Sequence, residues 1–460
     1  MNVKKLFAPT DMTQGTPWKS ILMFTMPMLI GNIAQQFYST VDTIVVGEYI
    51  GDNAIASVGS TLPILNMLLV LFMGISAGTS IMVAQYFGAK DRERLSNTIG
   101  TCITVTAAAC AFLIVVALPF IRPVLVALNT PAAILDGCVD YLTISLIGIA
   151  GMAYYNILSG IIRGMGDSVS TLIYLLVATV INIVLDIYFV RDLKMGIGGV
   201  ALATIIAQAV SSVLCLIKIA RMKEHFNFHF KLLKPVGSYV KTIVKLGIPS
   251  GLTQAIFSSA MIVVQSLTNQ FGEQFIAANV IVMRVDGFAM MPNFSFGMAL
   301  TTYAGQNVGA GLYDRVSKGA KQGTLMAVIC SAAVTVAILF FGKNLMGLFT
   351  KTQSLVDLSY SLMLILAVGY IAVAVTQSLS GIMRGAGDTM TPMWVSLITT
   401  VAIRVPIAYG ISYLTRTPEL PHGISRCIQI SLLASWVMGA LITAFFYARG
   451  KWKTKAIVGR

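Results

Sequence analysis

Five ionisable side chains stand inside long apolar stretches of the chain, where charge is costly. They are Asp42, Asp186, Arg284, Asp286 and Arg404. A charged side chain at the centre of a membrane-spanning helix costs about 2.5–3.5 kcal/mol, so such groups face a cavity by default and mark ion or substrate pathways. A poorly hydrated carboxylate can exchange a proton or a bound cation as its access to water changes. These residues therefore predict ion exchange coupled to movement of a substrate.

Two of the acids have polar neighbours at helical spacing. Asp42 follows Tyr38 by four residues and Gln35 by seven, and Asp186 follows Asn182 by four, so each set shares one helix face. Two carboxylates with amide and hydroxyl oxygens between them can share a proton or chelate Na⁺. The alternative is a structural hydrogen bond into the helix bundle, with Asn182 as the partner of the carboxylate.

A second group of polar and soft apolar residues lies in the second half of the chain. Arg284 and Asp286 are two residues apart and do not share a face, so each needs a partner on another helix. Arg404 either faces the interior of the bundle from within its span or lies near a helix end, with its charge reaching the membrane surface. A Met- and Phe-rich patch follows Asp286; drug contact and plain packing remain open for it. The candidate substrate contacts are Gln35, Tyr38, Arg284, Asp286, Met290, Met291, Phe294 and Gln377.

The composition identifies the elements that must position these groups. Of 460 residues, 56% are hydrophobic and 11% are charged, whereas a soluble domain carries about 25% charged residues. Apolar runs of roughly 20 residues, long enough to cross a bilayer as helices, recur twelve times. They are expected near 20–45, 54–82, 98–118, 141–161, 171–190, 197–217, 246–268, 276–304, 323–342, 360–381, 393–413 and 427–447. The predicted fold is an all-α integral membrane protein.

An internal repeat divides the twelve spans into two sixes. Residues 158–167 read LSGIIRGMGD and residues 379–388 read LSGIMRGAGD, with eight of ten positions identical and an offset of 379 − 158 = 221 residues. Six spans per half is an even number, so both halves enter the membrane in the same direction, as in parallel repeats of transporters. We predict two six-helix bundles: an N-lobe over 1–217, a cytoplasmic linker over 218–245 and a C-lobe over 246–460.

The basic charge of the chain is explained by its distribution. With the N-terminus inside, most lysines and arginines fall in inside loops, which fixes the orientation with both termini cytoplasmic. This accounts for the net charge of +14 without nucleic acid as a partner. The six cysteines lie mostly in apolar spans and read as small buried residues rather than a metal or disulfide framework. No cleavable signal peptide is expected.

Several of these features together resemble the multidrug and toxic compound extrusion (MATE) family over essentially the whole chain. They are the twelve spans in two parallel sixes, Pro27 followed by Asp42, Asn182-x-x-x-Asp186, and the doubled Arg-Gly-x-Gly-Asp turn. The resemblance implies efflux of bulky, often cationic drugs or toxins by antiport with H⁺ or Na⁺, through alternating access of a cavity between two lobes. It also implies a bacterial cytoplasmic (inner) membrane location, contact with membrane lipid, a monomer, and no cofactor besides the coupling ion.

The resemblance also assigns residues by position. The cation-coupling site is Asp42, Asn182, Asp186 and Thr204, which would also hold Na⁺, with Tyr141 and Asn156 as neighbours. Pro27 is the point where the first span is expected to bend. Another branch of the family has acids in spans seven and ten. This sequence has none there, so it resembles the branch that uses the N-lobe site. No catalytic residue and no other metal site are expected.

Three other functions share parts of this pattern. A flippase for a lipid-linked or amphiphilic substrate is the alternative, although an anionic carrier favours more cationic residues in the spans than Arg284 and Arg404. An intramembrane aspartyl protease shares a Gly-x-Gly-Asp signature, which here follows Arg163 and Arg384 in charged turns. A receptor or an uncoupled channel does not explain acids confined to one half of a repeat.

Overall fold

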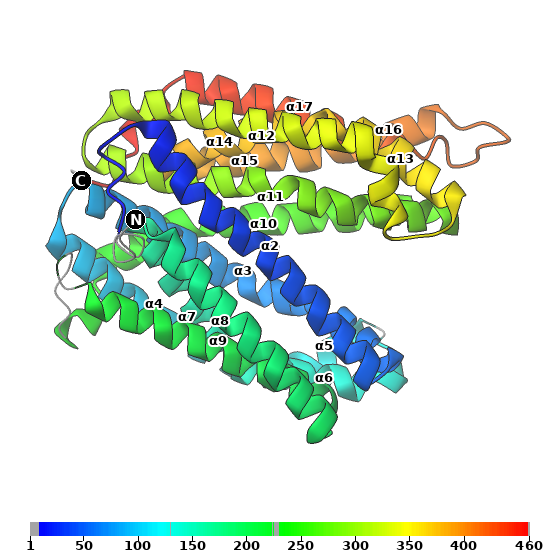
Figure 1. Cartoon of the computed structure of the whole chain (residues 1–460), viewed down its shortest axis with the longest axis horizontal. Coiled ribbons are helices and arrows are strands. Elements are labelled where there is room, and N and C mark those ends of the chain that lie inside the picture. The colour runs from blue at the N-terminus through cyan, green and yellow to red at the C-terminus, as the bar shows by residue number, and fades with distance from the viewer. Residues whose placement is uncertain (1–8, 129, 223, 225–229, 459–460) are drawn as a thin grey trace. The chain divides into compact units, whose positions relative to one another are not determined.

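The computed structural model describes residues 9–128, 130–222, 224 and 230–458, without the side chains of 38–44, 47, 52, 53, 55, 230 and 231. Every regular element in these residues is a helix, and most helices are long and apolar (Figure 1). Counting each sharply bent pair as one, eleven spans are long and apolar enough to cross a membrane among the residues searched. The remaining predicted span is α2 (Pro17–Tyr49), a 33-residue helix. The prediction of an all-α membrane protein with twelve spans is confirmed.

The helices form two compact units. Unit 1 contains Met26–Gly251 and the residues up to Asp11, and unit 2 contains Met12–Thr25 and Leu252–Arg460. Most of the predicted N-lobe falls in unit 1, together with the described part of the predicted linker, and most of the predicted C-lobe falls in unit 2. The first turns of α2 group with unit 2, and the start of α10 (Gly237–Thr268) groups with unit 1. The helix α10 also begins at Gly237, nine residues before the predicted start of the C-lobe at residue 246.

Unit 1 carries the first six spans. Besides α2 they are α3 (Asp52–Gly88), α4 (Arg92–Ala117), which runs through η1 (Leu118–Phe120) into α5 (Ile121–Ala127), the pair α6 (Ala132–Ile147) and α7 (Ile149–Gly164), α8 (Ser168–Ile187) with the π-helix η2 (Tyr188–Asp192), and α9 (Gly196–Arg221). The helices α8 and α9 run side by side (Figure 1). In the linker, η3 (Phe230–Leu233) packs on α4.

Unit 2 repeats this arrangement. After α10 and η4 (Asn269–Phe271) come α11 (Glu273–Gly309), α12 (Tyr313–Gly347) and the pair α13 (Gln353–Ala367) and α14 (Gly369–Gly385). The next span is continuous and consists of α15 (Met390–Leu397), the π-helix η5 (Ile398–Arg404) and α16 (Val405–Leu414), and α17 (Cys427–Ala448) and η6 (Lys451–Thr454) follow it. The helices α11 and α14 form the most extensive pair of this unit. Its buried core contains Leu362, Met363, Leu366 and Tyr370.

Each unit contains one bent span at the same place in the repeat. The pair α6 and α7 bends by 50° at Gly148, and the pair α13 and α14 bends by 45° before Gly369. The two glycines are 221 residues apart. A Cβ on Gly148 would lie 2.4 Å from Ile205, and one on Gly369 would lie 2.5 Å from Trp436. The bends therefore allow a neighbouring helix to approach closely.

The start of α10 is fixed to α3 by glycines on both helices. A Cβ on Gly74 would lie 2.7 Å from the carbonyl oxygen of Gly247, and one on Gly247 would lie 2.6 Å from that of Gly74. Gly78 and Gly251 extend the same contact, so a Gly-x-x-x-Gly segment of one helix faces one of the other. This contact lies wholly within unit 1, although α10 continues into unit 2.

Candidate functional site

The repeated Arg-Gly-x-Gly-Asp turns are structural. Asp167 caps α8, accepting hydrogen bonds from the backbone N–H of Ser170 at 2.9 Å and from its hydroxyl at 2.7 Å, and it pairs with Lys218 at 3.0 Å. Asp388 accepts equivalent bonds from Thr391 at 3.2 and 2.7 Å. A carboxylate engaged in this way at a helix N-terminus stabilises the orphan N–H groups there. These bonds argue against the aspartyl protease alternative.

The polar residues of span five lie inside unit 1. Asn182 is fully buried and Asp186 is 1% exposed, although α8 is otherwise strongly apolar. The Asn182 side-chain nitrogen donates to the hydroxyl of Thr204 on α9 at 3.3 Å. Its carbonyl oxygen has no hydrogen-bond partner within the described part of the chain. A buried amide oxygen without a donor is suited to a cation, a water molecule or a proton-bearing group.

The two predicted neighbours differ in their availability. Tyr141 on α6 is 4% exposed and therefore buried within the same unit. The side-chain nitrogen of Asn156 instead donates to the carbonyl of Met152 on its own helix at 2.8 Å, and the Asn156 backbone carbonyl accepts from the hydroxyl of Ser76 at 2.8 Å. Asn156 thus contributes to packing of α7 on α3. Its role at the cation site stays a prediction.

Span one holds the remaining predicted coupling residues. The side chains of Asp42 and Tyr38 lie outside the described ones, so their contacts with Asp186 stay a prediction. Gln35 is exposed on α2. Pro27 lies inside α2, two residues after Thr25, where the helix passes from unit 2 to unit 1. Proline lacks the N–H that would bond the carbonyl of the preceding turn, so the helix is missing one backbone hydrogen bond here and can bend.

Unit 2 brings together an acid, a tyrosine and an arginine. The Tyr370 hydroxyl on α14 donates to the Asp286 carboxylate on α11 at 2.8 Å. Arg404 ends η5 in the middle of its span and is 7% exposed. Of the two predicted positions, the one inside the span is therefore confirmed, and the one near a helix end at the membrane surface is wrong. The π-turns before Pro406, which lacks an N–H, place Arg404 inside the unit.

A polar stripe on α11 was missed from the sequence. Asn279, Asp286 and Asn293 follow one another at intervals of seven residues and so lie along one face. Asn279 accepts from Gln429 at 2.9 Å, and Asn293 accepts from the hydroxyl of Ser331 at 2.6 Å. The seven-residue spacing of amides around an acid in an apolar span is the signal that could have revealed this set.

The other candidate substrate residues of unit 2 lie beside this stripe. Met290 and Met291 are partly buried on α11, Phe294 is 47% exposed, and Arg284 is exposed. Gln377 on α14 is partly buried where α14 packs against α11. Gln35 and Tyr38 belong to unit 1, and their prediction as partners of these residues in one cavity stays untested.

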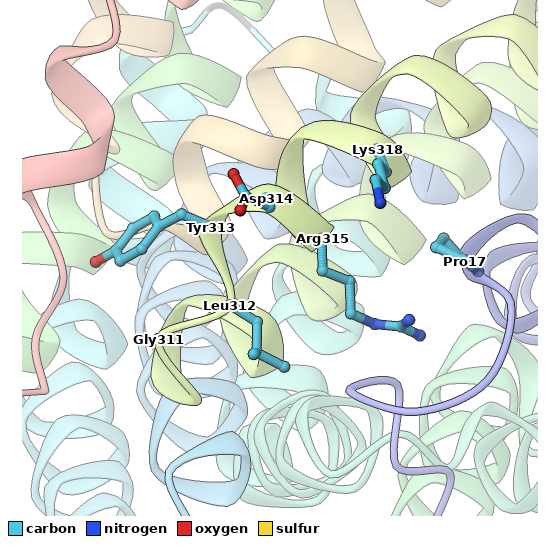
Figure 2. Close-up of a pocket in the computed structure, with 7 residues that line it drawn as sticks. All are labelled: Pro17, Gly311, Leu312, Tyr313, Asp314, Arg315 and Lys318. Carbon is cyan, nitrogen blue, oxygen red and sulfur yellow. The ribbon is translucent and has the colours of Figure 1, made fainter.

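A charged cavity at the turn between α11 and α12 holds the segment before α2. Its volume is about 600 Å³, and Pro17, the first residue of α2, lies on its lining. Figure 2 shows Arg315 extending across the cavity toward Pro17 and the segment that precedes it. Arg315 donates to the carbonyls of Met12 and Gly15, at 3.1 and 2.7 Å. All these residues belong to unit 2. Arg315 therefore anchors the chain before span one.

A second cavity of about 590 Å³ lies between α6 and the turn before α9, and includes the exposed acid Asp140. Among the described residues, no three His, Cys, Asp or Glu side chains are grouped to hold a metal ion. Neither observation adds a residue to the predicted coupling site. Its described part is the set of buried polar groups on α8 and α9.

The fold defines a multi-span membrane protein with two six-span units. The family model MatE matches residues 27–188 and 249–410, once in each half. The chain belongs to this family, which is a family of transporters and not of enzymes. The predictions of family, fold and transport are confirmed.

Similar proteins agree with this assignment. "Probable multidrug resistance protein YoeA" of Bacillus subtilis is 28% identical over 96% of this chain and 95% of its own. "Probable multidrug resistance protein NorM" of Thermotoga maritima is 24% identical over 96% and 94%. A solved structure described as "Crystal structure of MATE in the straight conformation" matches with a TM-score of 0.88 at 23% identity, covering 96% of this chain and 97% of that one. The structural likeness supports the fold.

Proposed function

We propose that this transporter exports bulky, often cationic organic compounds across a bacterial inner membrane, in antiport with H⁺ or Na⁺. Asp42, Asn182, Asp186 and Thr204 are the cation-coupling residues, with Tyr141 beside them. The observation that carries the proposal is the buried polar set of α8 and α9. Asn182 and Asp186 are removed from solvent in an apolar unit, and the Asn182 oxygen lacks a donor in the described residues.

Multidrug export is supported by relatives that match over nearly their whole length and are named multidrug resistance or export proteins, including "Multidrug export protein MepA" of Staphylococcus haemolyticus. Alternating access requires the coupling site to exchange its cation from either side of the membrane. A carboxylate with neighbouring amide and hydroxyl oxygens suits both H⁺ and Na⁺, because both stabilise its charge when water is withdrawn.

The lipid flippase alternative has weaker support. Of the two arginines inside spans, Arg404 is buried and Arg284 alone is exposed. An anionic lipid headgroup calls for several accessible cations. The orientation follows from the positive-inside rule, which places both termini in the cytoplasm.

The test is uptake of a fluorescent cationic dye into inside-out vesicles under an imposed pH gradient or an imposed Na⁺ gradient. We expect one gradient to drive uptake by the wild type, and both Asp42→Asn and Asp186→Asn to abolish it. Asp136→Asn is the matched control, because Asp136 is an acid of unit 1 with an 81% exposed side chain. Wild-type uptake by both coupling variants would refute the assignment, and absence of gradient-driven uptake of any cation would favour the flippase.

A further inference from the structure

The acid of α11 is only partly satisfied by its surroundings. Tyr370 is fully buried, and its hydroxyl donates to Oδ1 of Asp286. Asp286 itself is partly exposed. Among the described residues, the bond from Tyr370 to Oδ1 is the hydrogen bond that this carboxylate accepts, and none reaches Oδ2. One oxygen is therefore fixed by the protein while the other remains available. A carboxylate inside a membrane span with one oxygen lacking a hydrogen bond costs free energy unless another group binds it.

The counter-ion of this acid is held at a distance. The guanidinium of Arg404 interacts electrostatically with Asp286. The two groups do not form an ion pair within 4.0 Å, unlike the five pairs found among the described residues. Arg404 is 7% exposed, and its Nε has no hydrogen-bond partner among the described residues. A buried ion pair stabilises well only with direct contact and full hydrogen bonding. This pair lacks both, so Arg404 is a weak partner that a closer cation can replace.

The accessible side of Asp286 adjoins a soft apolar face. Met283 lies three residues before it and is 42% exposed, and Phe294 further along α11 is 47% exposed. Between them Gly287 borders open space, because a Cβ built there would meet no atom within 4 Å. Methionine and aromatic side chains adapt to bulky ligands and attract cations through sulfur and ring contacts. One carboxylate beside such a face is complementary to an organic cation with an aromatic body.

We propose that Asp286 receives the charged nitrogen of an organic cation inside unit 2, and that Arg404 is its resting counter-ion, which the ligand displaces. The site is separate from the coupling residues of α8 and α9, which lie in the other unit. The inference rests on the proposed function only in taking the bound cation to be an exported compound. It predicts effects of opposite sign at the two charged residues, whereas a purely structural pair would be harmed by either change.

The experiment is binding of ethidium, a permanent aromatic cation, to the purified full-length protein in a non-ionic detergent, followed by fluorescence titration. Asp286→Asn keeps an acceptor for Tyr370 and removes the charge, so the Kd should rise at least tenfold. Arg404→Gln removes the competing charge, so the Kd should fall severalfold. Glu273→Gln and Arg426→Gln are matched controls, because both residues are exposed in the same unit, and their Kd should stay within twofold of wild type.

Each outcome decides the inference. The inference is overturned if ethidium binds more weakly to both Asp286→Asn and Arg404→Gln, or if the Kd of either variant is unchanged. It is also overturned if Glu273→Gln changes the Kd as much as Asp286→Asn does. Wild-type thermal unfolding curves for the variants would show that the effects do not arise from misfolding. Binding is measured without an ion gradient. If the Kd values change as expected but no gradient drives dye uptake, the proposed function is rejected and the binding site stands. If a gradient drives dye uptake but the Kd values do not change as expected, only the binding site is rejected.

Discussion

The glycine contact between α3 and α10 gives a prediction whose size follows from distances. In Gly247→Ala the new Cβ would lie 2.6 Å from the Gly74 carbonyl oxygen and 2.9 Å from its carbon. Both atoms are backbone, so one helix must move to restore a normal contact. Overpacking of this kind destabilises by typically 1–3 kcal/mol. Replacing glycine by alanine also stabilises a helix by about 1 kcal/mol through its higher helix propensity. This gain must be separated from the loss of stability that the clash causes.

Gly237→Ala provides that separation. Gly237 begins the same helix, and a Cβ there would meet no atom within 4 Å. We expect an unfolding temperature equal to or above wild type for this control. Gly247→Ala should unfold on the order of 5 °C below the control, at roughly 2–4 °C per kcal/mol for a unit of this size. The assay is thermal unfolding of both purified variants in one detergent. If Gly247→Ala unfolds at or above the temperature of Gly237→Ala, the close contact of α10 with α3 is not what fixes this helix in unit 1.

Three further changes test separate features. Asp167→Ala should lower the unfolding temperature more than Asp388→Ala, since both lose a helix cap worth about 1 kcal/mol but only Asp167 also loses a buried ion pair; equal losses would contradict this. Arg315→Ala should expose the segment before α2 to limited proteolysis, because it removes the bonds to that segment's carbonyls, whereas the exposed Lys318→Ala should digest like wild type. Pro27→Ala restores the missing backbone N–H and should slow dye transport without weakening substrate binding; unchanged turnover would make Pro27 a structural kink only.

Features with a strong local cause were predictable from the sequence. The twelve spans follow from apolar run length, and the two sixes follow from the repeated turn. The position of Asn182 and Asp186 on one buried face follows from helical spacing. The partner of Asn182 was also predicted as part of the site, because Thr204 was assigned there by resemblance, and the two side chains are hydrogen-bonded.

Features that depend on packing between distant segments were not predictable. The sequence left two positions open for Arg404, because the π-turns that place it inside the unit have no clear sequence signature. The same holds for Tyr370, whose role as the partner of Asp286 depends on how α14 lies against α11. The exchange of the first turns of α2 and α10 between the units is likewise set by tertiary contacts.

The proposed function requires that Asp42 and Asp186 of unit 1 couple export to an ion. The most direct test is to load proteoliposomes with a transported dye and to follow H⁺ or Na⁺ movement as the dye flows down its own gradient. The account predicts that dye flow drives the coupling ion uphill in the opposite direction, and that Asp186→Asn abolishes the ion movement. Dye flow without ion movement in the wild type, or ion movement preserved in Asp186→Asn, would contradict it.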